Sequence, residues 1–186
     1  MTINFSGCEI KSHEIRTGDN ANLLSELLVN IDTIFLMVDV TSNKTLDDIS
    51  KEITFLKNDL KFNKQIILVS NKIDMNNKRK ISKLDISTLA KNLQLKLVEI
   101  SIKDNINVVK LFNSILIENS NSSKNNLRPL YTETTNSNSK SDTVYKILLL
   151  GNSSVGKTSF FKRYFNNIFT DLKLESIGNL IWNNFF

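Results

Sequence analysis

Cysteine, proline and histidine are nearly absent from this chain of 186 residues, which contains one of each. A single cysteine excludes an intramolecular disulfide and a zinc site built from cysteines, and it is typical of a reducing compartment. The lone histidine, His13, falls in a predicted strand, and we interpret it as structural rather than as a general base. The sequence has neither a signal peptide nor a run of about 18 apolar residues, so we expect a cytoplasmic protein without a membrane span.

Neither basic nor acidic residues strongly predominate, because the chain has 24 basic and 19 acidic residues and a net charge of only +5. A solvated, lysine-rich surface accounts for this balance better than a nucleic-acid footprint does, so no nucleic-acid partner is expected. Hydrophobic residues make up 40% of the chain. That share, at this length, is enough for the core of one domain with a linker.

Apolar segments of strand length alternate with segments of helical period, which predicts an α/β fold with a doubly wound sheet. Five helices are expected, at residues 23–29, 45–60, 84–93, 106–117 and 157–165. Six strands are expected, at residues 10–15, 34–40, 66–70, 96–100, 146–150 and 177–186.

Residues 151–158 read GNSSVGKT, a complete G-x-x-x-x-G-K-[ST] phosphate loop between an apolar run and a helical segment. The two glycines let successive backbone N–H groups converge on phosphate oxygens, and the N-terminus of the following helix adds to the attraction. Lys157 is expected to reach the β- and γ-phosphates, and Thr158 is expected to bind Mg²⁺.

A second motif, Asn71-Lys72-Ile73-Asp74, follows the apolar run at residues 65–70. The Asp74 carboxylate can accept hydrogen bonds from N1–H and the 2-amino group of guanine, a donor pair that adenine lacks, while the Lys72 stem covers the ring. Taken alone, this tetrapeptide is explained equally well as a polar turn after a strand and as a guanine-binding motif. Because both motifs follow predicted strands, where open α/β sheets bind ligands, the nucleotide interpretation is favoured.

Residues 99–103, EISIK, resemble the E-x-S-A-K loop of small GTPases, in which a backbone N–H touches the guanine carbonyl. Residues 31–41 and 151–178 are similar to the central strand and to the phosphate loop, first helix and switch I of the Rab branch. The chain therefore resembles a Rab-like small GTPase of the Ras superfamily. The resemblance implies a P-loop NTPase fold, a three-layer sandwich around a mostly parallel six-stranded sheet.

The resemblance also implies ligands and partners. GTP or GDP with Mg²⁺ would bind, and an effector, an exchange factor or a GTPase-activating protein would be a partner. Phe169 falls where the family stacks an aromatic ring on guanine, and Ser176 falls where switch I contacts Mg²⁺. The chain shows no prenylation cysteine at its C-terminus, so no prenyl membrane anchor is visible. The candidate GTP-binding residues are Gly151, Asn152, Ser153, Ser154, Val155, Gly156, Lys157, Thr158, Phe169, Ser176, Asn71, Lys72, Asp74, Ser101, Ile102 and Lys103; the metal ligands are Thr158 and Ser176.

The order of these elements is rotated relative to the family. Residues 1–118 resemble the back part, with switch II, the guanine loops and the last helix, and residues 144–186 resemble the front part. Between them, residues 119–143 are rich in Asn, Ser, Thr and Lys and read as a flexible linker with a reach of roughly 25 Å. Two interpretations remain: a circularly permuted domain, or a window across two tandem GTPases.

Switch II departs from the family pattern. Aligning the segment RTGDN with D-T-A-G-Q places Arg16 on the acid, Asp19 on the glycine and Asn20 on the water-positioning glutamine. Moving the register by one residue restores the glycine but not the acid. With Lys157 and Asn20 as the remaining candidate catalytic residues, we expect slow GTP hydrolysis in a vesicle-traffic setting. The alternatives are a pseudo-GTPase interaction module and a fragment that is not functional alone.

Overall fold

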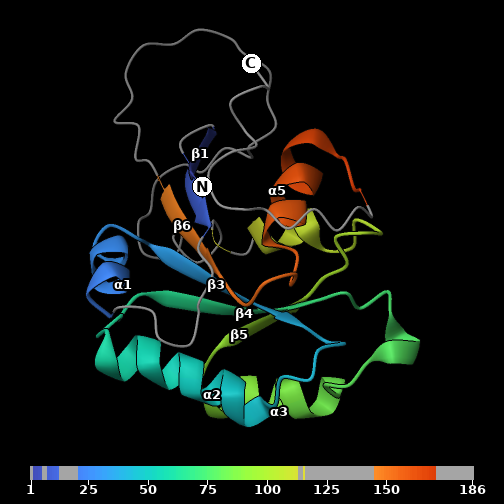
Figure 1. Ribbon diagram of the computed structural model, residues 1–186, viewed down its shortest axis with the longest axis horizontal. Coiled ribbons are helices and arrows are strands. Elements are labelled where there is room, and N and C mark those ends of the chain that lie inside the picture. The colour runs from blue at the N-terminus through green and yellow to red at the C-terminus, as the bar shows by residue number, and fades with distance from the viewer. Residues whose placement is uncertain (1, 6–7, 13–20, 113–114, 116–144, 171–186) are drawn as a thin grey trace, which may run out of the picture.

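The computed structural model describes residues 2–5, 8–12, 21–112, 115 and 145–170 (Figure 1). Its centre is one six-stranded sheet in the order β1-β2-β6-β3-β4-β5. Every neighbouring pair is parallel except β1 and β2, which pair antiparallel. The strands are β1 (Thr2–Phe5), β2 (Cys8–Ser12), β3 (Thr33–Asp39), β4 (Gln65–Asn71), β5 (Lys96–Glu99) and β6 (Tyr145–Leu150).

Helices cover both faces of this sheet, as the buried parallel strands require (Figure 1). On one side lie α2 and α3, with α1 at the edge of the same layer; α5 lies on the other side together with helical turns at 108–112. The helices are α1 (Ala21–Leu28), α2 (Leu46–Thr54), α3 (Lys83–Asn92) and α5 (Lys157–Asn166), with a π-helical turn at Phe55–Asp59 and a 3-10 turn at Asn76–Lys78.

Alternate residues of the central strands fill two separate cores. Ile34, Leu36 and Leu68 face α1, α2 and α3, where they meet buried side chains such as Ile53. Phe35, Met37, Ile67, Val69, Ile147 and Leu149 face the other way and pack against Phe112, Phe160 and Phe161. The predicted α/β class, the mostly parallel sheet and the three layers are therefore confirmed.

The antiparallel edge strand β1 was not among the strands expected from the sequence. The strand expected at residues 177–186 lies outside the described residues. Only two residues separate β1 from β2, and Phe5 pairs with Cys8. A two-residue connection costs little entropy to close, which favours the pairing of these two strands as a hairpin.

The strand that precedes the phosphate loop lies in the interior of the sheet. β6 is the last of the described strands in sequence, but it pairs with β2 from Cys8↔Tyr145 to Ser12↔Leu149 and with β3 from Thr33↔Ile147 to Leu36↔Leu150. The parts of the chain on either side of residues 119–143 therefore share one sheet. This is the arrangement that a permuted order requires.

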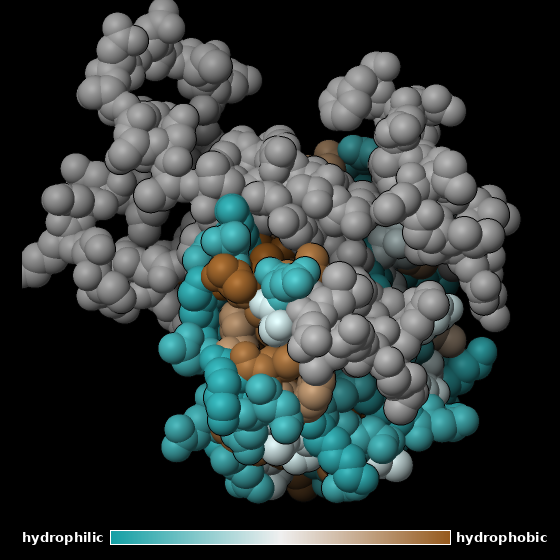
Figure 2. Space-filling view, turned by 60° about the vertical axis from the view of Figure 1, so that its left-hand side comes forward, coloured by the Kyte–Doolittle hydropathy of each residue, from teal (hydrophilic) through white to brown (hydrophobic). Residues whose placement is uncertain are grey.

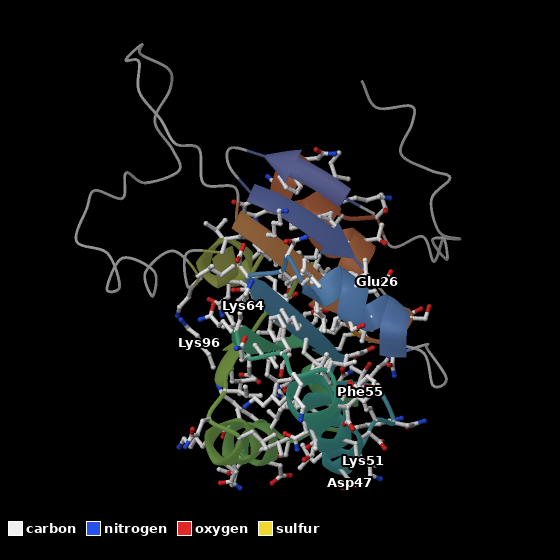
Figure 3. All side chains as sticks on the ribbon, turned by 90° about the vertical axis from the view of Figure 1, so that its left-hand side faces the viewer. Glu26, Asp47, Lys51, Phe55, Lys64 and Lys96 are labelled. Atoms are coloured by element: carbon white, nitrogen blue, oxygen red, sulfur yellow. The ribbon has the colours of Figure 1, made fainter. Side chains whose placement is uncertain are left out.

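The described surface is mainly polar on the side seen in Figure 2, where hydrophilic residues surround a smaller hydrophobic area. On α2, Lys51 and Asp47 form an ion pair of 2.7 Å with both side chains more than 70% exposed; Figure 3 shows them on the outer side of the helix, away from the sheet. Among the described residues, no helix combines the length and the apolar character needed to cross a membrane.

Candidate functional site

The loop at residues 151–158 joins β6 to α5 at the carboxyl edge of the sheet. Gly151 has a φ of +148°, and a Cβ built there would lie 2.5 Å from the Met37 carbonyl oxygen. Gly156 has a φ of +103°, and a Cβ built there would lie 2.6 Å from Asn71 Nδ2. The backbone therefore runs against β3 and the Asn71 side chain at two points where a larger residue would collide.

Inside this loop positive φ angles alternate with ordinary negative ones. Ser154 has a φ of +62°, Gly156 is also left-handed, and α5 begins at Lys157. Such an alternation turns successive N–H groups to one side and forms an anion-binding concavity, which the N-terminus of the helix reinforces. Asn152, Ser153 and Ser154 are exposed, whereas Val155 is buried below them. The loop thus has the form of a phosphate cradle.

Lys157 folds back onto the loop from the first turn of α5. Its ammonium donates hydrogen bonds to the carbonyl oxygens of Gly151 at 2.7 Å and Asn152 at 2.8 Å. A cation is thereby held beside the exposed loop amides, where the charge of a phosphate would be neutralised.

Asn71 connects the phosphate loop to the segments predicted to bind guanine. The side chain is 2% exposed at the end of β4. Its Nδ2 donates to the Val155 carbonyl at 2.8 Å, and its Oδ1 accepts from the Ile102 amide at 3.3 Å. One amide group therefore joins three segments that lie far apart in the sequence.

Asp74 is oriented by the loop at residues 99–103. The buried Ser101 hydroxyl donates to Asp74 Oδ1 at 2.7 Å and accepts from the Asp104 amide at 3.0 Å. The half-buried carboxylate is thus fixed at the edge of the sheet, where it can accept a pair of hydrogen bonds from a ligand.

Lys72 has a φ of +69°, and its ammonium lies 2.6 Å from Asp39 Oδ2 at the end of β3. The other oxygen of Asp39 accepts from the Thr41 amide at 2.8 Å and the Thr41 hydroxyl at 2.7 Å. The lysine stem is therefore held in place by a carboxylate that is itself fixed. The role of Asp39 was not predicted, although its position at the end of a strand beside β4 was a sequence signal for it.

Ile102, which stands where the family has alanine, is directed into the core. The side chain is 2% exposed and packs in the cluster on the α5 side of the sheet. Its Cδ1 would lie 3.0 Å from a Cβ on Gly156, so it fills the space under the phosphate loop. Lys103, the next residue, is exposed.

Arg163 on α5 links this loop to Phe169. The guanidinium donates to the carbonyl oxygens of Ile102 at 2.8 Å and Lys103 at 2.6 Å, and its Cζ lies 5.7 Å from the centre of the Phe169 ring. Phe169 is half-buried. The ring predicted to stack on guanine is therefore brought next to the loop predicted to contact the base.

The residues present can provide part of a magnesium site. Thr158 is half-buried in the first turn of α5, next to Lys157, which is a suitable place for a hydroxyl ligand beside bound phosphates. The described residues contain no group of three or more acidic, histidine or cysteine side chains that could hold a metal alone. Ser176, Asn20, Arg16 and Asp19 lie outside the described residues.

Glu99 anchors the start of the loop at residues 99–103 to the neighbouring turn. Its carboxylate accepts from Arg79 Nη2 at 2.5 Å and pairs with Lys83 at 3.2 Å. Burial alone would raise the pKa of Glu99, but the hydrogen bonds from Arg79 and Lys83 outweigh it and hold that pKa below its ordinary value. The backbone carbonyl of Glu99 accepts from Asn107 Nδ2 at 2.8 Å, so the loop is fixed from two sides.

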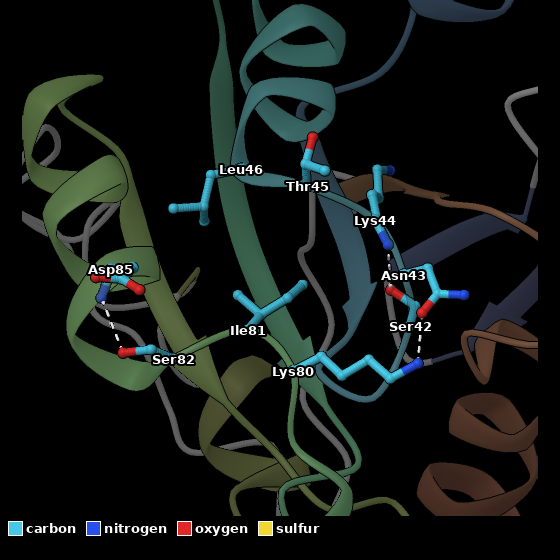
Figure 4. Close-up of a pocket in the computed structure, with 9 residues that line it drawn as sticks. All are labelled: Ser42, Asn43, Lys44, Thr45, Leu46, Lys80, Ile81, Ser82 and Asp85. Atoms are coloured by element: carbon cyan, nitrogen blue, oxygen red, sulfur yellow. Dashed lines mark hydrogen bonds between the residues drawn. The ribbon is translucent and has the colours of Figure 1, made fainter.

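A pocket of about 380 Å³ lies apart from these motifs, between the N-termini of α2 and α3 (Figure 4). Two lysines line it. Lys44 pairs with Glu52 at 2.6 Å, and Lys80 donates to the Asn43 side chain. Because both ammonium groups have partners within the protein, we assign no ligand to this pocket.

Comparison with known proteins agrees with this geometry. The sequence model of the Ras family matches residues 19–121, more than half of the chain. Circularly permutated Ras protein 1 of Dictyostelium discoideum is 24% identical over 106 residues, which are 57% of this chain and 10% of that protein. Human Ras-related protein Rab-3A is 44% identical over 48 residues, which are 26% of this chain and 22% of that protein.

Ras-related protein Rab-13 of Mesocricetus auratus is 32% identical over 82 residues, covering 44% of this chain and 40% of that protein. Each of these alignments thus spans less than half of the relative's own length.

Proposed function

Because the chain belongs to the Ras family, we propose that it is a small GTPase that binds GTP and GDP. The phosphates would lie in the loop at residues 151–158, and guanine would lie between Asp74, Lys72 and the loop at residues 101–103. Phe169 would cover the remaining face of the base. The resemblance to Rab proteins further suggests a role in vesicle traffic.

The observation that carries this proposal is the pair of hydrogen bonds made by Asn71. They hold the phosphate loop and the guanine loop at fixed places along one edge of the sheet, 2.8 Å and 3.3 Å from the same amide group. A nucleotide bridges the same two places, with its phosphates at one and its base at the other. The protein thereby organises the site before a ligand binds, which lowers the ordering cost of binding.

Mg²⁺ fits this site as a partner of the nucleotide. Thr158, together with Ser176 from switch I, would hold the ion against the phosphate oxygens, and the bound ion would neutralise charge that develops there. Lys157 supplies a second positive charge from the protein. Among the described residues, Asn71, Lys72 and Asp74 would orient the nucleotide.

We further propose that the chain is a circular permutant rather than a window across two tandem domains. In that arrangement, residues 1–118 and 144–186 are the back and front of one domain, joined by a linker at residues 119–143. Support comes from the interior position of β6, which pairs with both β2 and β3.

A pseudo-GTPase interaction module is the second candidate, favoured by the switch II segment. Arg16, Asp19 and Asn20 replace the acid, glycine and glutamine of the family pattern. A protein of that kind would keep nucleotide binding for stability and would not cycle between GTP and GDP. Hydrolysis, rather than binding, distinguishes the two candidates.

Competition for labelled GDP in the presence of Mg²⁺ tests the proposed function. GTP should displace the label, and ATP should not. Asp74→Ala should weaken GDP binding by ~1–3 kcal/mol, because it leaves the guanine donors unpaired. Asp59→Ala, which removes an exposed carboxylate from the π-helical turn, serves as the control and should bind GDP as the unmodified protein does. Displacement by ATP as effective as that by GTP would contradict the assignment.

A further inference from the structure

We propose that Arg163 is a positioning residue for guanine recognition, an inference that rests on the proposed function. It lies in the last turn of α5, which begins at the phosphate loop, and it acts on the loop at residues 101–104 about 60 positions earlier. Its guanidinium would fix the peptide groups and the carboxylate that read the base. Discrimination of guanine from adenine, more than affinity for phosphate, would depend on it.

Two hydrogen bonds fix consecutive peptide groups of the loop. Arg163 Nε donates to the Ile102 carbonyl at 2.8 Å, and Nη2 donates to the Lys103 carbonyl at 2.6 Å. A trans peptide is planar, so its N–H points opposite to its C=O. Holding these two carbonyls toward α5 therefore turns the amides of Lys103 and Asp104 away from the helix.

The amide of Asp104 passes this orientation to the carboxylate. It donates to the Ser101 hydroxyl at 3.0 Å, and that hydroxyl donates to Asp74 Oδ1 at 2.7 Å. Because Ser101 is fully buried, water cannot replace either of these hydrogen-bond partners. The chain of contacts runs from Arg163 through the Lys103–Asp104 peptide and Ser101 to Asp74.

The same guanidinium also holds the segment that carries Phe169. Its Nη1 donates to the Asn167 carbonyl at 3.0 Å, and its Cζ lies 5.7 Å from the centre of the Phe169 ring. Asn105 on the guanine loop reinforces this link through a 3.4 Å hydrogen bond to the Asn167 side chain. Both sides of the proposed base site are therefore tied to one side chain.

Arginine is suited to this task because its rigid fork presents several donors in fixed directions. A lysine would keep the positive charge near the C-terminus of α5, where a cation is favourable, but it cannot serve three carbonyl groups with one geometry. Arg163→Lys therefore separates the fork from the charge. If Arg163 only stabilised the helix end through its charge, the Arg163→Lys variant would bind GDP as well as the unmodified chain does.

The experiment compares Arg163→Ala and Arg163→Lys with the unmodified full chain, using displacement of labelled GDP by unlabelled GDP and by ADP in the presence of Mg²⁺. Both variants should lose GDP affinity by at least about ten-fold, the factor that corresponds to one hydrogen bond to a charged group. Their ADP affinity should fall by a smaller factor, because adenine uses only the Phe169 side of the site, so the preference for guanine should decrease. Lys162→Ala, a change of the neighbouring cation on α5, should leave both affinities as they were.

The possible outcomes separate the roles. An equal loss of GDP and ADP affinity in both variants would overturn the proposal, and so would an Arg163→Lys protein that binds GDP as tightly as the unmodified chain. Either result would leave Arg163 with a structural role in α5. If Arg163→Ala fails to fold, as judged by thermal unfolding without nucleotide, the comparison rests on Arg163→Lys. Failure of the unmodified chain to bind GDP would instead overturn the proposed function.

Discussion

Gly151 occupies a position where the phosphate loop has no space for a side chain. A Cβ there would meet the Met37 carbonyl of β3 at 2.5 Å, and the φ of +148° is strained for any L side chain. We expect Gly151→Ala to lower the free energy of unfolding by ~1–3 kcal/mol and to weaken GDP binding, because the loop must move away from β3. Chemical denaturation measures the first effect. Ser153→Ala, in the exposed part of the same loop, is the control for stability, and an equally stable Gly151→Ala protein would contradict the argument.

We expect any GTP hydrolysis by this chain to depend on the replaced residues of switch II. With Arg16 and Asn20 at the positions of the acid and the glutamine, intrinsic GTP hydrolysis should not exceed that of unassisted Ras, about 3–5 × 10⁻⁴ s⁻¹. The combined change Arg16→Asp, Asp19→Gly and Asn20→Gln should accelerate it, since residues that act together are not additive. Phosphate release in a single turnover measures the rate. A triple variant no faster than the unmodified chain would show that another residue positions the water.

Residues that form contiguous motifs carry a signal in the sequence, whereas those that act on backbone groups do not. Asn71 and Asp74 were proposed from a tetrapeptide, and in the structure both contact the loop at residues 99–103. Arg163 was missed because its partners are carbonyl groups about 60 residues away, and a carbonyl has no side-chain signature in the sequence. Asp39 was missed for a different reason, since its partner Lys72 had already been assigned to the base.

Apolar periodicity in the sequence predicts the positions of the helices and strands better than it predicts where each one ends. One helix was predicted at residues 45–60, but α2 ends at Thr54 and continues as a π-helical turn in which the Leu60 amide bonds to the Phe55 carbonyl at 3.0 Å. Ile49, Ile53 and Leu56 are nonetheless buried on one side. Periodicity identifies the buried face of a helix, but it does not distinguish an α turn from a π turn.

The attachment of β5 to the turn before α3 should make stability depend on pH. The folded pKa of Glu99 lies below its ordinary value of 4.5, so its pairs with Arg79 and Lys83 stabilise the fold above that pH and lose their effect as the pH falls through the folded pKa. Glu99→Gln should therefore destabilise the protein most at neutral pH. Urea unfolding across an acidic pH series measures this difference. A difference between the two proteins that stays constant down to strongly acidic pH would contradict the assignment.

The molecule as a whole depends on a strand contributed from the far end of the chain. Residues 147–150 of β6 are fully buried, and they contact both cores between β2 and β3. Without this strand the two neighbours would face each other across a gap, with unpaired backbone groups on both sides. The fold class could be predicted from motifs and periodicity, but the position of β6 required the family order, because the sequence order of strands does not determine their order in a sheet.

The pairing of β6 also tests the permuted arrangement directly. If a protease site is placed within residues 119–143 and cut, the two pieces should remain associated, because β6 is held by ladders on both sides and by buried side chains rather than by the connection. Cutting removes only the high effective concentration that a tether provides, so association should become concentration-dependent. Size-exclusion chromatography and labelled-GDP binding before and after cleavage measure the outcome. Under the tandem interpretation the pieces belong to different domains, so separation on cutting, with loss of GDP binding at all concentrations, would favour that interpretation instead.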